Sequence, residues 1–184
     1  HVSMAGNSLS VVAFLCLAIG AFAKAGAMPF HTWIPECSKS TPGPVMAFLP
    51  ASLDKLLGIY LLARISLDMF IVIPRSWVSV MLLIIGSVTI IAAVMMALVQ
   101  HNLKKLLAYH AVSQVGYMVL GIGTGNLIGI AGGLFHMVNN AIYKSCLFLS
   151  GGSVEKEAKT AELDELGGLA RFMPITLATS LVAV

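Results

Sequence analysis

The stretch NLIGIAGGLFHMVNNAIYKSCLFLS, residues Asn126 to Ser150, is mostly apolar over the length of a membrane span, yet it carries three polar side chains at steps of four. They are His136, Asn140 and Lys144. A step of four turns a helix by about 40° and climbs about 6 Å, so these side chains form one ladder. A lysine at the centre of a bilayer costs about 3 kcal/mol and normally faces the bundle interior or a wet cavity. The pattern predicts a helix that lines a proton path.

The composition is that of an integral membrane protein. Of 184 residues, 58% are hydrophobic and 10% are charged, whereas a soluble domain carries about 25% charged residues. The mean hydropathy is +0.93. The net charge of +3 is small and the sequence has no long basic run, so we expect no nucleic-acid partner. Three widely spaced cysteines predict neither a disulfide framework nor a metal site, and we expect no cofactor and no catalytic residue.

Apolar segments of about 20 residues divide the chain into five nearly complete spans and a sixth that is cut short, all expected to be helices. We expect one transmembrane domain over residues 1–184, an internal piece of a longer subunit. The connectors near residues 33, 100 and 155 should share one side, and the basic pair Lys104 and Lys105 favours the cytoplasm for it. Residues 153–166 should form an exposed acidic connector. The six segments are Leu9 to Met28, Val45 to Ile65, Trp77 to Val99, Leu106 to Gly123, Asn126 to Ser150 and Ile175 to Val184.

The first two segments also carry charges. Lys24 lies near the end of the first segment, just before a proline, so that helix should end or break close to its own lysine. Asp54 and Lys55 lie near the middle of the second segment, which Pro50 should break. A register from Ala51 to Ile73 would instead place both charges in the first turn, and the sequence leaves both registers open. Neighbours on a helix point about 100° apart, so at least one of the two charges should find a partner on another helix.

The fourth segment holds too many polar side chains for a helix that faces lipid, so we expect it inside the bundle. In the third and fifth segments, Gly86, Ser87 and the pair Gly132 and Gly133 suit close helix contact. The polar side chains of the fourth segment are those of Tyr109, His110, Ser113, Gln114 and Tyr117.

The buried lysines are candidate proton carriers because desolvation disfavours a charged ammonium, which lets a buried lysine exchange its proton. The alternative for Lys24 and Lys144 is that their side chains snorkel to the membrane surface. Imidazole titrates near neutrality, so His136 can relay protons, although a lone histidine is more often a packing residue. The candidate relay residues are Lys24, Asp54, Lys55, His136, Asn140 and Lys144, with His110 and Lys104 as secondary candidates.

Several stretches, in this order along nearly the whole chain, closely resemble the antiporter-like family. This family contains the large ion-translocating membrane subunits of respiratory complex I, of multisubunit sodium/proton antiporters and of energy-converting membrane-bound hydrogenases. Pro44 to Lys55 (PVMAFLPASLDK) is most similar to the hydrogenase branch. The matching stretches are Ala23 to Glu36 (AKAGAMPFHTWIPE), Gly58 to Arg64 (GIYLLAR), Lys104 to Tyr109 (KKLLAY), Ser113 to Met118 (SQVGYM), Phe135 to Lys144 (FHMVNNAIYK) and Gly167 to Leu169 (GGL).

The resemblance implies an all-helical bundle of about six helices, corresponding to helices seven to twelve of a 14-helix fold whose seventh helix is broken. It places Lys24 on the lysine of that seventh helix and Lys55 near the lysine or histidine of the eighth. His136 and Lys144 fall on the eleventh helix. Asn140 departs from the pattern because some members have a second histidine there. The family's glutamate in helix five and its lysine or glutamate in helix twelve lie outside this chain.

The implied function is translocation of protons, with sodium as the alternative ion, by a subunit of a redox-driven complex whose redox centres lie in other subunits. Expected partners are further membrane subunits, a peripheral hydrogenase or dehydrogenase arm, and the lipid of a prokaryotic cytoplasmic membrane. One alternative is a subunit of a multisubunit sodium/proton antiporter without redox coupling. Two others are a haem-binding cytochrome, with His110 and His136 as ligands, and a purely structural membrane anchor.

Overall fold

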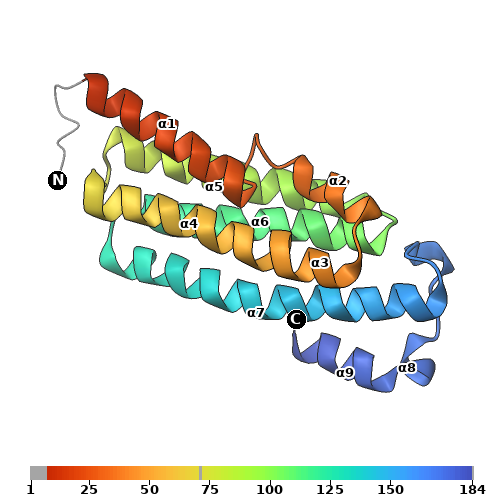
Figure 1. Cartoon of the computed structure of the whole chain (residues 1–184). Coiled ribbons are helices and arrows are strands. Elements are labelled where there is room, and N and C mark those ends of the chain that lie inside the picture. Colours follow the sequence, from red (N-terminus) through yellow and green to blue (C-terminus); the bar gives the residue numbers. More distant parts are fainter. Residues whose placement is uncertain (1–7, 71, 184) are drawn as a thin grey trace.

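The chain folds into a bundle of helices that run roughly parallel or antiparallel to one another (Figure 1). The computed structural model describes residues 8–70 and 72–183. This part contains no strand, so the predicted all-helical fold is confirmed. The helices are α1 (Ser8–Ala25), α2 (Trp33–Ser40), α3 (Gly43–Phe48), α4 (Asp54–Arg64), α5 (Trp77–Leu98), α6 (Leu103–Gly123), α7 (Leu127–Ala158), α8 (Leu169–Phe172) and α9 (Pro174–Val182), with π-helical turns η1 (Leu49–Leu53) and η2 (Ile65–Met69) and the 3₁₀ turn η3 (Leu163–Glu165).

Within the described residues, four helical units are long and apolar enough to cross a membrane, and they match the first four predicted segments. They are α1, the 27-residue run from α3 to η2, α5 and α6. The fifth segment is α7, whose 32 residues make about 48 Å of helix. It continues past its predicted end at Ser150. The sixth segment is followed as α9, and its last residue, Val184, lies outside the described part of the chain.

The predicted break beside Lys24 is confirmed, because α1 ends one residue after it and α2 begins only after a loop. In Figure 1 the two helices lie roughly in line, with the loop between them. The N–H of Met28 donates to the hydroxyl of Thr89 on α5 (3.2 Å). The indole N–H of Trp33 donates to the carbonyl of Ala23 (3.2 Å). These bonds satisfy backbone groups that the interruption of the helix leaves without partners.

The second span is continuous from Gly43 to Met69, so Pro50 does not break it. A proline removes an N–H and crowds the carbonyl four residues earlier, and the wider π-helical turn η1 accommodates this. At the end of that turn, the N–H of Asp54 bonds to the carbonyl of Leu49, five residues back. The sequence left two registers open, Val45 to Ile65 and Ala51 to Ile73. The observed span is closer to the first, since Asp54 and Lys55 lie near its middle.

Glycines let α6 pack backbone to backbone against both of its neighbours. A Cβ at Gly86 of α5 would lie 2.8 Å from the carbonyl oxygen of Gly116, and a Cβ at Gly116 would lie 2.7 Å from that of Gly86. On the other side of α6, a Cβ at Gly121 would lie 2.8 Å from the Cα of Gly133. The predicted close contacts at Gly86 and Gly133 are therefore confirmed, whereas a Cβ at Gly132 would meet no atom within 4 Å.

Replacing Gly116 by alanine should lower the melting temperature of the purified protein in detergent. The new methyl group would meet the backbone of Gly86 at 2.7 Å, and overpacking of this kind costs about 1–3 kcal/mol. Gly20→Ala in the middle of α1 is the matched control, because a Cβ there meets nothing within 4 Å. Since alanine favours a helix over glycine by about 1 kcal/mol, the control should keep or raise the melting temperature. If Gly116→Ala did not lower the melting temperature, this would contradict the close backbone contact between α5 and α6 at Gly86 and Gly116.

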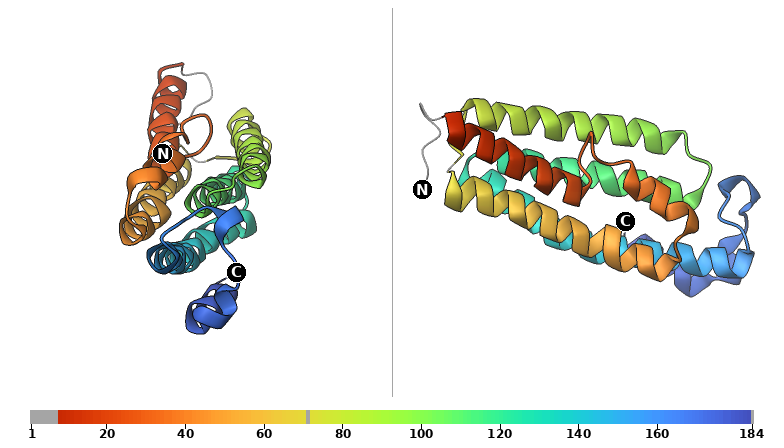
Figure 2. Two further views of the ribbon diagram at one scale, coloured as in Figure 1. Left: turned by 90° about the vertical axis from the view of Figure 1, so that its right-hand side faces the viewer. Right: turned by 45° about the horizontal axis from the view of Figure 1, so that its top comes forward.

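The three connectors predicted to share one side do meet at one end of the bundle, as the right-hand view of Figure 2 shows. The ammonium of Lys104, at the start of α6, lies 2.9 Å from the carboxylate of Glu155 on α7 and donates to the carbonyl of Thr41 before α3 (3.3 Å). The chain beyond α7 folds back here, because the N–H of Leu103 donates to the carbonyl of Ala161 (2.8 Å). These contacts tie the ends of α2, α6 and α7 together.

Candidate functional site

Two of the lysines predicted inside the membrane converge on one turn of α6. Lys55 of α4 donates to the carbonyl oxygen of Ala111 (2.7 Å). The Nζ atom of Lys144 on α7 lies 2.9 Å from Nδ1 of His110. Lys55 is 2% exposed and Lys144 is 1% exposed. Lys144 therefore does not snorkel to the surface of the described part of the chain.

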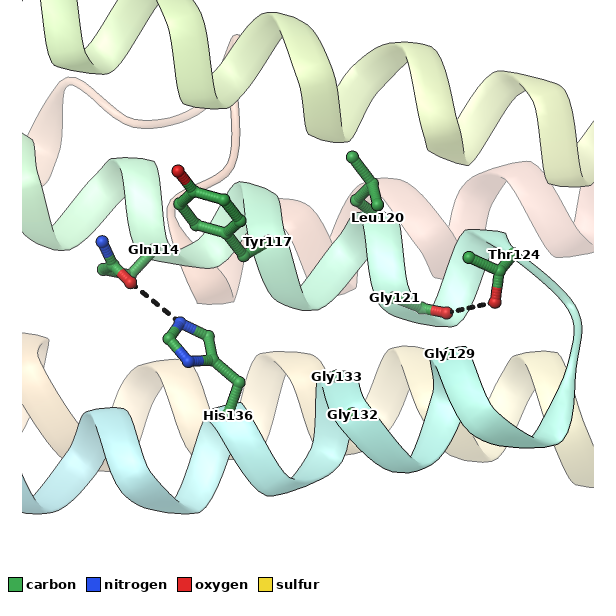
Figure 3. Close-up of a pocket in the computed structure, with 9 residues that line it drawn as sticks. All are labelled: Gln114, Tyr117, Leu120, Gly121, Thr124, Gly129, Gly132, Gly133 and His136. Carbon is green, nitrogen blue, oxygen red and sulfur yellow. Dashed lines mark hydrogen bonds between the residues drawn. The ribbon is translucent and has the colours of Figure 1, made fainter.

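A second polar network joins α7 to α6 beside this pair. Nε2 of His136 lies 2.8 Å from Oε1 of Gln114 (Figure 3). The hydroxyl of Tyr143 donates to the same oxygen (3.0 Å), and Nδ2 of Asn140 donates to that hydroxyl (2.7 Å). An amide oxygen only accepts, so His136 donates from Nε2. The four side chains thus form one hydrogen-bonded chain in which two donors point at an amide that does not titrate.

Both networks border cavities between α6 and α7. One cavity of about 660 Å³ also reaches the end of α9. A second, of about 530 Å³, has Gln114 and His136 on its wall and glycines of both helices along its length (Figure 3). Gln114 and His136 line both cavities, so the second network borders each of them. The polar residues that line the larger cavity are His110, Gln114, His136, Asn139, Tyr143 and Lys144.

The third part of the site lies where α1 breaks. Lys24 reaches Asp54, the first residue of α4, and forms an ion pair with it. The Asp54 side chain is 18% exposed, whereas that of Lys24 is 50% exposed. The two helices approach closely because a Cβ at Gly58 would lie 2.7 Å from the Cβ of Ala25. The expectation that Asp54 or Lys55 finds a partner on another helix is confirmed for both residues.

These contacts form one row of polar groups from α1 to α7. Asp54 and Lys55 are adjacent in the chain, as are the two α6 residues that the buried lysines contact. The Nζ atom of Lys144 also lies 5.6 Å from the centroid of the Tyr143 ring, which belongs to the second network. Titratable side chains therefore follow one another from the broken helix to the ladder helix. In order, the row contains Lys24, Asp54, Lys55, His110, Lys144, Tyr143, Gln114 and His136, and Asn140 bonds to Tyr143 at its side.

Comparison with known proteins shows where this arrangement belongs. The family model described as NADH:quinone oxidoreductase/Mrp antiporter, TM, matches residues 1–184. The chain belongs to this family. Among curated relatives in the family, F(420)H(2) dehydrogenase subunit L of Methanosarcina mazei is 37% identical over 188 aligned positions, which cover 100% of the chain and 27% of the relative. Hydrogenase-4 component B of Escherichia coli is 30% identical over 187 positions, covering 95% of the chain and 28% of the relative.

The solved structures agree with the family assignment. A chain of the Mrp complex from Dietzia sp. aligns with a TM-score of 0.91 and 26% identity, covering 98% of this chain and 34% of that one. The helices described above therefore have the fold of an antiporter-like subunit, and the chain is that of an integral membrane protein, as the sequence predicted. The chain spans 27% and 28% of the length of the two curated relatives.

The two secondary candidate residues, His110 and Lys104, lie in different parts of this fold. His110 lies at the centre of the row as the contact of Lys144, while Lys104 ties connectors together at one end of the bundle. Sequence reasoning did not select Gln114 and Tyr143 as site residues. Gln114 follows His110 by four residues, the same step that relates the three ladder residues of α7, so this repeated spacing is a signal that could have identified it.

Proposed function

We propose that the full-length subunit translocates protons across a membrane, with sodium as the alternative ion. The observation that carries the proposal is the convergence of Lys55 and Lys144, both buried, on adjacent residues of one α6 turn. Ionisable groups inside a membrane are costly and mark ion pathways. Packing alone gives no reason for two lysines from different helices to meet at the same turn. Transfer of charge between them gives one.

The proposed mechanism is electrostatic. Two unit charges about 8 Å apart interact by about 2 kcal/mol at an effective dielectric constant of about 20. A proton on Lys55 therefore makes a second proton on Lys144 less favourable, and charge arriving at one lysine displaces charge from the next. The pair of Lys24 and Asp54 forms one end of this row, and the network of Asn140 and His136 forms the other. No redox chemistry is required of the chain itself.

The proposed partners follow from the relatives, which are a dehydrogenase subunit, a hydrogenase component and a chain of the Mrp complex. By this similarity the subunit assembles with other membrane subunits in the lipid of a prokaryotic cytoplasmic membrane. A peripheral hydrogenase or dehydrogenase arm then supplies the driving force. The chain is proposed to be one transmembrane domain, residues 1–184, of that larger subunit, with residues 153–166 as its exposed acidic connector. The likeness to the Mrp complex supports the alternative, a sodium/proton antiporter without a redox arm.

The function is tested with the full-length subunit in its purified complex, reconstituted into proteoliposomes that contain a pH-sensitive dye. Lys55→Met should slow translocation about tenfold, equivalent to about 1.4 kcal/mol, because methionine keeps the apolar stem and removes the ammonium that bonds to α6. Lys39→Met is the control, since Lys39 pairs with Glu36 (2.6 Å) on the exposed face of α2. Equal rates for wild type and Lys55→Met would contradict the proposal.

The same vesicles distinguish the two driving forces. A dye response that requires an electron donor, such as H₂ or a reduced nicotinamide or deazaflavin, supports a redox-driven complex. A response to an imposed sodium gradient without any electron donor, from a complex that lacks hydrogenase and dehydrogenase subunits, supports the antiporter alternative.

A further inference from the structure

Asn140 carries a buried hydrogen-bond acceptor that its surroundings leave unpaired. The residue is 1% exposed, and its Nδ2 donates to the Tyr143 hydroxyl. Its Oδ1 has no hydrogen-bond partner in the part of the chain that the structure describes. A buried carbonyl oxygen without a donor is unfavourable, and native structures nearly always supply one. A donor that moves into reach of Oδ1 would resolve this.

Lys144 has the position and the chemistry to be that donor. It follows Asn140 by one turn of α7, and both side chains are buried. Side chains on a helix lean toward its N-terminus, over the residue four positions earlier, so the stem of Lys144 extends toward Asn140. The Cβ atoms of such a pair are about 5–6 Å apart, within reach of a four-carbon stem. An ammonium has three hydrogens, and one contact of this nitrogen is the 2.9 Å approach to His110.

We propose that the ammonium of Lys144 alternates between two acceptors, Nδ1 of His110 and Oδ1 of Asn140, an inference that rests on the proposed function. The acceptors differ in chemistry, because an imidazole nitrogen can take up a proton near neutrality and an amide oxygen cannot. At His110, an N–H bond of Lys144 breaks and an N–H bond forms on Nδ1, leaving a neutral amine and an imidazolium. At Asn140 the lysine keeps its proton. Asn140 is thus a positioning residue that holds the charged lysine away from its transfer partner.

The surroundings favour this movement. The ring of Tyr143 lies 5.6 Å from the lysine nitrogen, and an aromatic ring at this distance stabilises a cation. Lys144 also lines the cavity of about 660 Å³, which gives the side chain room to move. In the second network, Tyr143 and His136 both donate to Gln114, whose amide oxygen passes no proton on. Proton exchange in this part of the row therefore takes place only at His110, and it depends on whether Lys144 lies at His110 or at Asn140.

Three variants of the full-length subunit, in its complex and in proteoliposomes, test the inference. Asn140→Leu keeps the branched shape and the number of heavy atoms but removes the acceptor. It should slow proton translocation about tenfold, the effect of losing one hydrogen bond to a charged group. Asn140→Gln lengthens the side chain by one methylene but keeps an amide oxygen, and it should restore the rate to within about threefold of wild type. Ser153→Ala is the control, because Ser153 lies on the same helix with an exposed side chain and its hydroxyl bonds only to the carbonyl of Leu149, away from both cavities. Its rate should not change.

The test compares the translocation rates of the two Asn140 variants. If Asn140 acts through its hydrogen bond, the Gln variant is faster than the Leu variant, and if it acts only through packing, the Leu variant is faster. A Gln variant that is slower than the Leu variant would show that the site needs only a branched side chain of this length, and would overturn the inference. A Leu variant at the wild-type rate, in a series where Lys144→Met slows translocation about a hundredfold, would overturn the two-acceptor inference while leaving the proposed function intact. A Lys144→Met complex that translocates protons at the wild-type rate would instead overturn the proposed function, and the inference with it.

Discussion

Replacing Lys144 by methionine is expected to slow ion translocation by the assembled complex about a hundredfold, the contribution typical of a positioned proton-transfer group. Methionine keeps an unbranched apolar stem but has no ammonium, so the 2.9 Å contact with His110 is lost. Lys144 is 1% exposed, and replacing a buried charge by an apolar side chain of similar volume is often neutral or stabilising. We therefore expect loss of transport together with an unchanged or higher melting temperature.

The opposite directions of these two effects make the Lys144 variant informative. Translocation is measured as dye quenching in proteoliposomes, and stability as the melting temperature of the same purified complex. Lys156→Met is the control, since Lys156 lies on the same helix but is exposed beyond the ladder. Normal transport in the Lys144 variant would contradict its role in the row. We expect the Lys144 variant complex to be at least as stable as wild type. A variant complex that fails to assemble would contradict this expectation.

Asp54→Lys is expected to have the second largest effect, because it places a like charge beside Lys24 where an ion pair now stands. At about 4 Å and a dielectric constant of about 20 the repulsion is about 4 kcal/mol, and we halve it to about 2 kcal/mol for solvent screening, since the Lys24 side chain is 50% exposed. An energy of about 2 kcal/mol corresponds to about a thirtyfold slower translocation. The melting temperature should fall as well.

A charge exchange between the two residues tests whether the pair itself matters. The double variant Lys24→Asp with Asp54→Lys restores opposite charges and should recover transport to within about tenfold of wild type. Asp68→Lys is the control in the same span, because Asp68 pairs with Arg64 (2.8 Å) and its side chain is 49% exposed. No recovery in the double variant would show that the position of each charge matters more than the pair.

Hydropathy was sufficient to locate the long apolar helices among the described residues, because a membrane span requires a long apolar helix whose backbone bonds itself. The break after Lys24 was predicted from a following proline and is present. Pro50 was expected to interrupt the second span, but the chain absorbs it in the π-helical turn η1. Whether a proline breaks a helix depends on how neighbouring backbone groups find partners, and this is decided by packing rather than by local sequence.

The ladder on α7 was predicted from the step of four, and two of its members, Asn140 and Lys144, are indeed buried. The partners of the ladder were not predicted. Periodicity states which residues share a face of one helix, but it does not state which face of another helix lies opposite. His110 was therefore only a secondary candidate, although it contacts Lys144 directly. Gln114 and Tyr143 were missed for the same reason.

By itself, the sequence determined that this chain is a membrane-embedded helical bundle and that three lysines are carried within its apolar segments, because hydropathy and helical period are local properties. The tertiary structure alone decided what those charges contact. It brings Lys24 to Asp54, and it brings Lys55 and Lys144 to one turn of α6. The physical reason is that a buried charge must take its partner from a neighbouring helix. Which helix lies alongside depends on the close contacts between helices at glycines and on the connectors, and these cannot be read from any single segment.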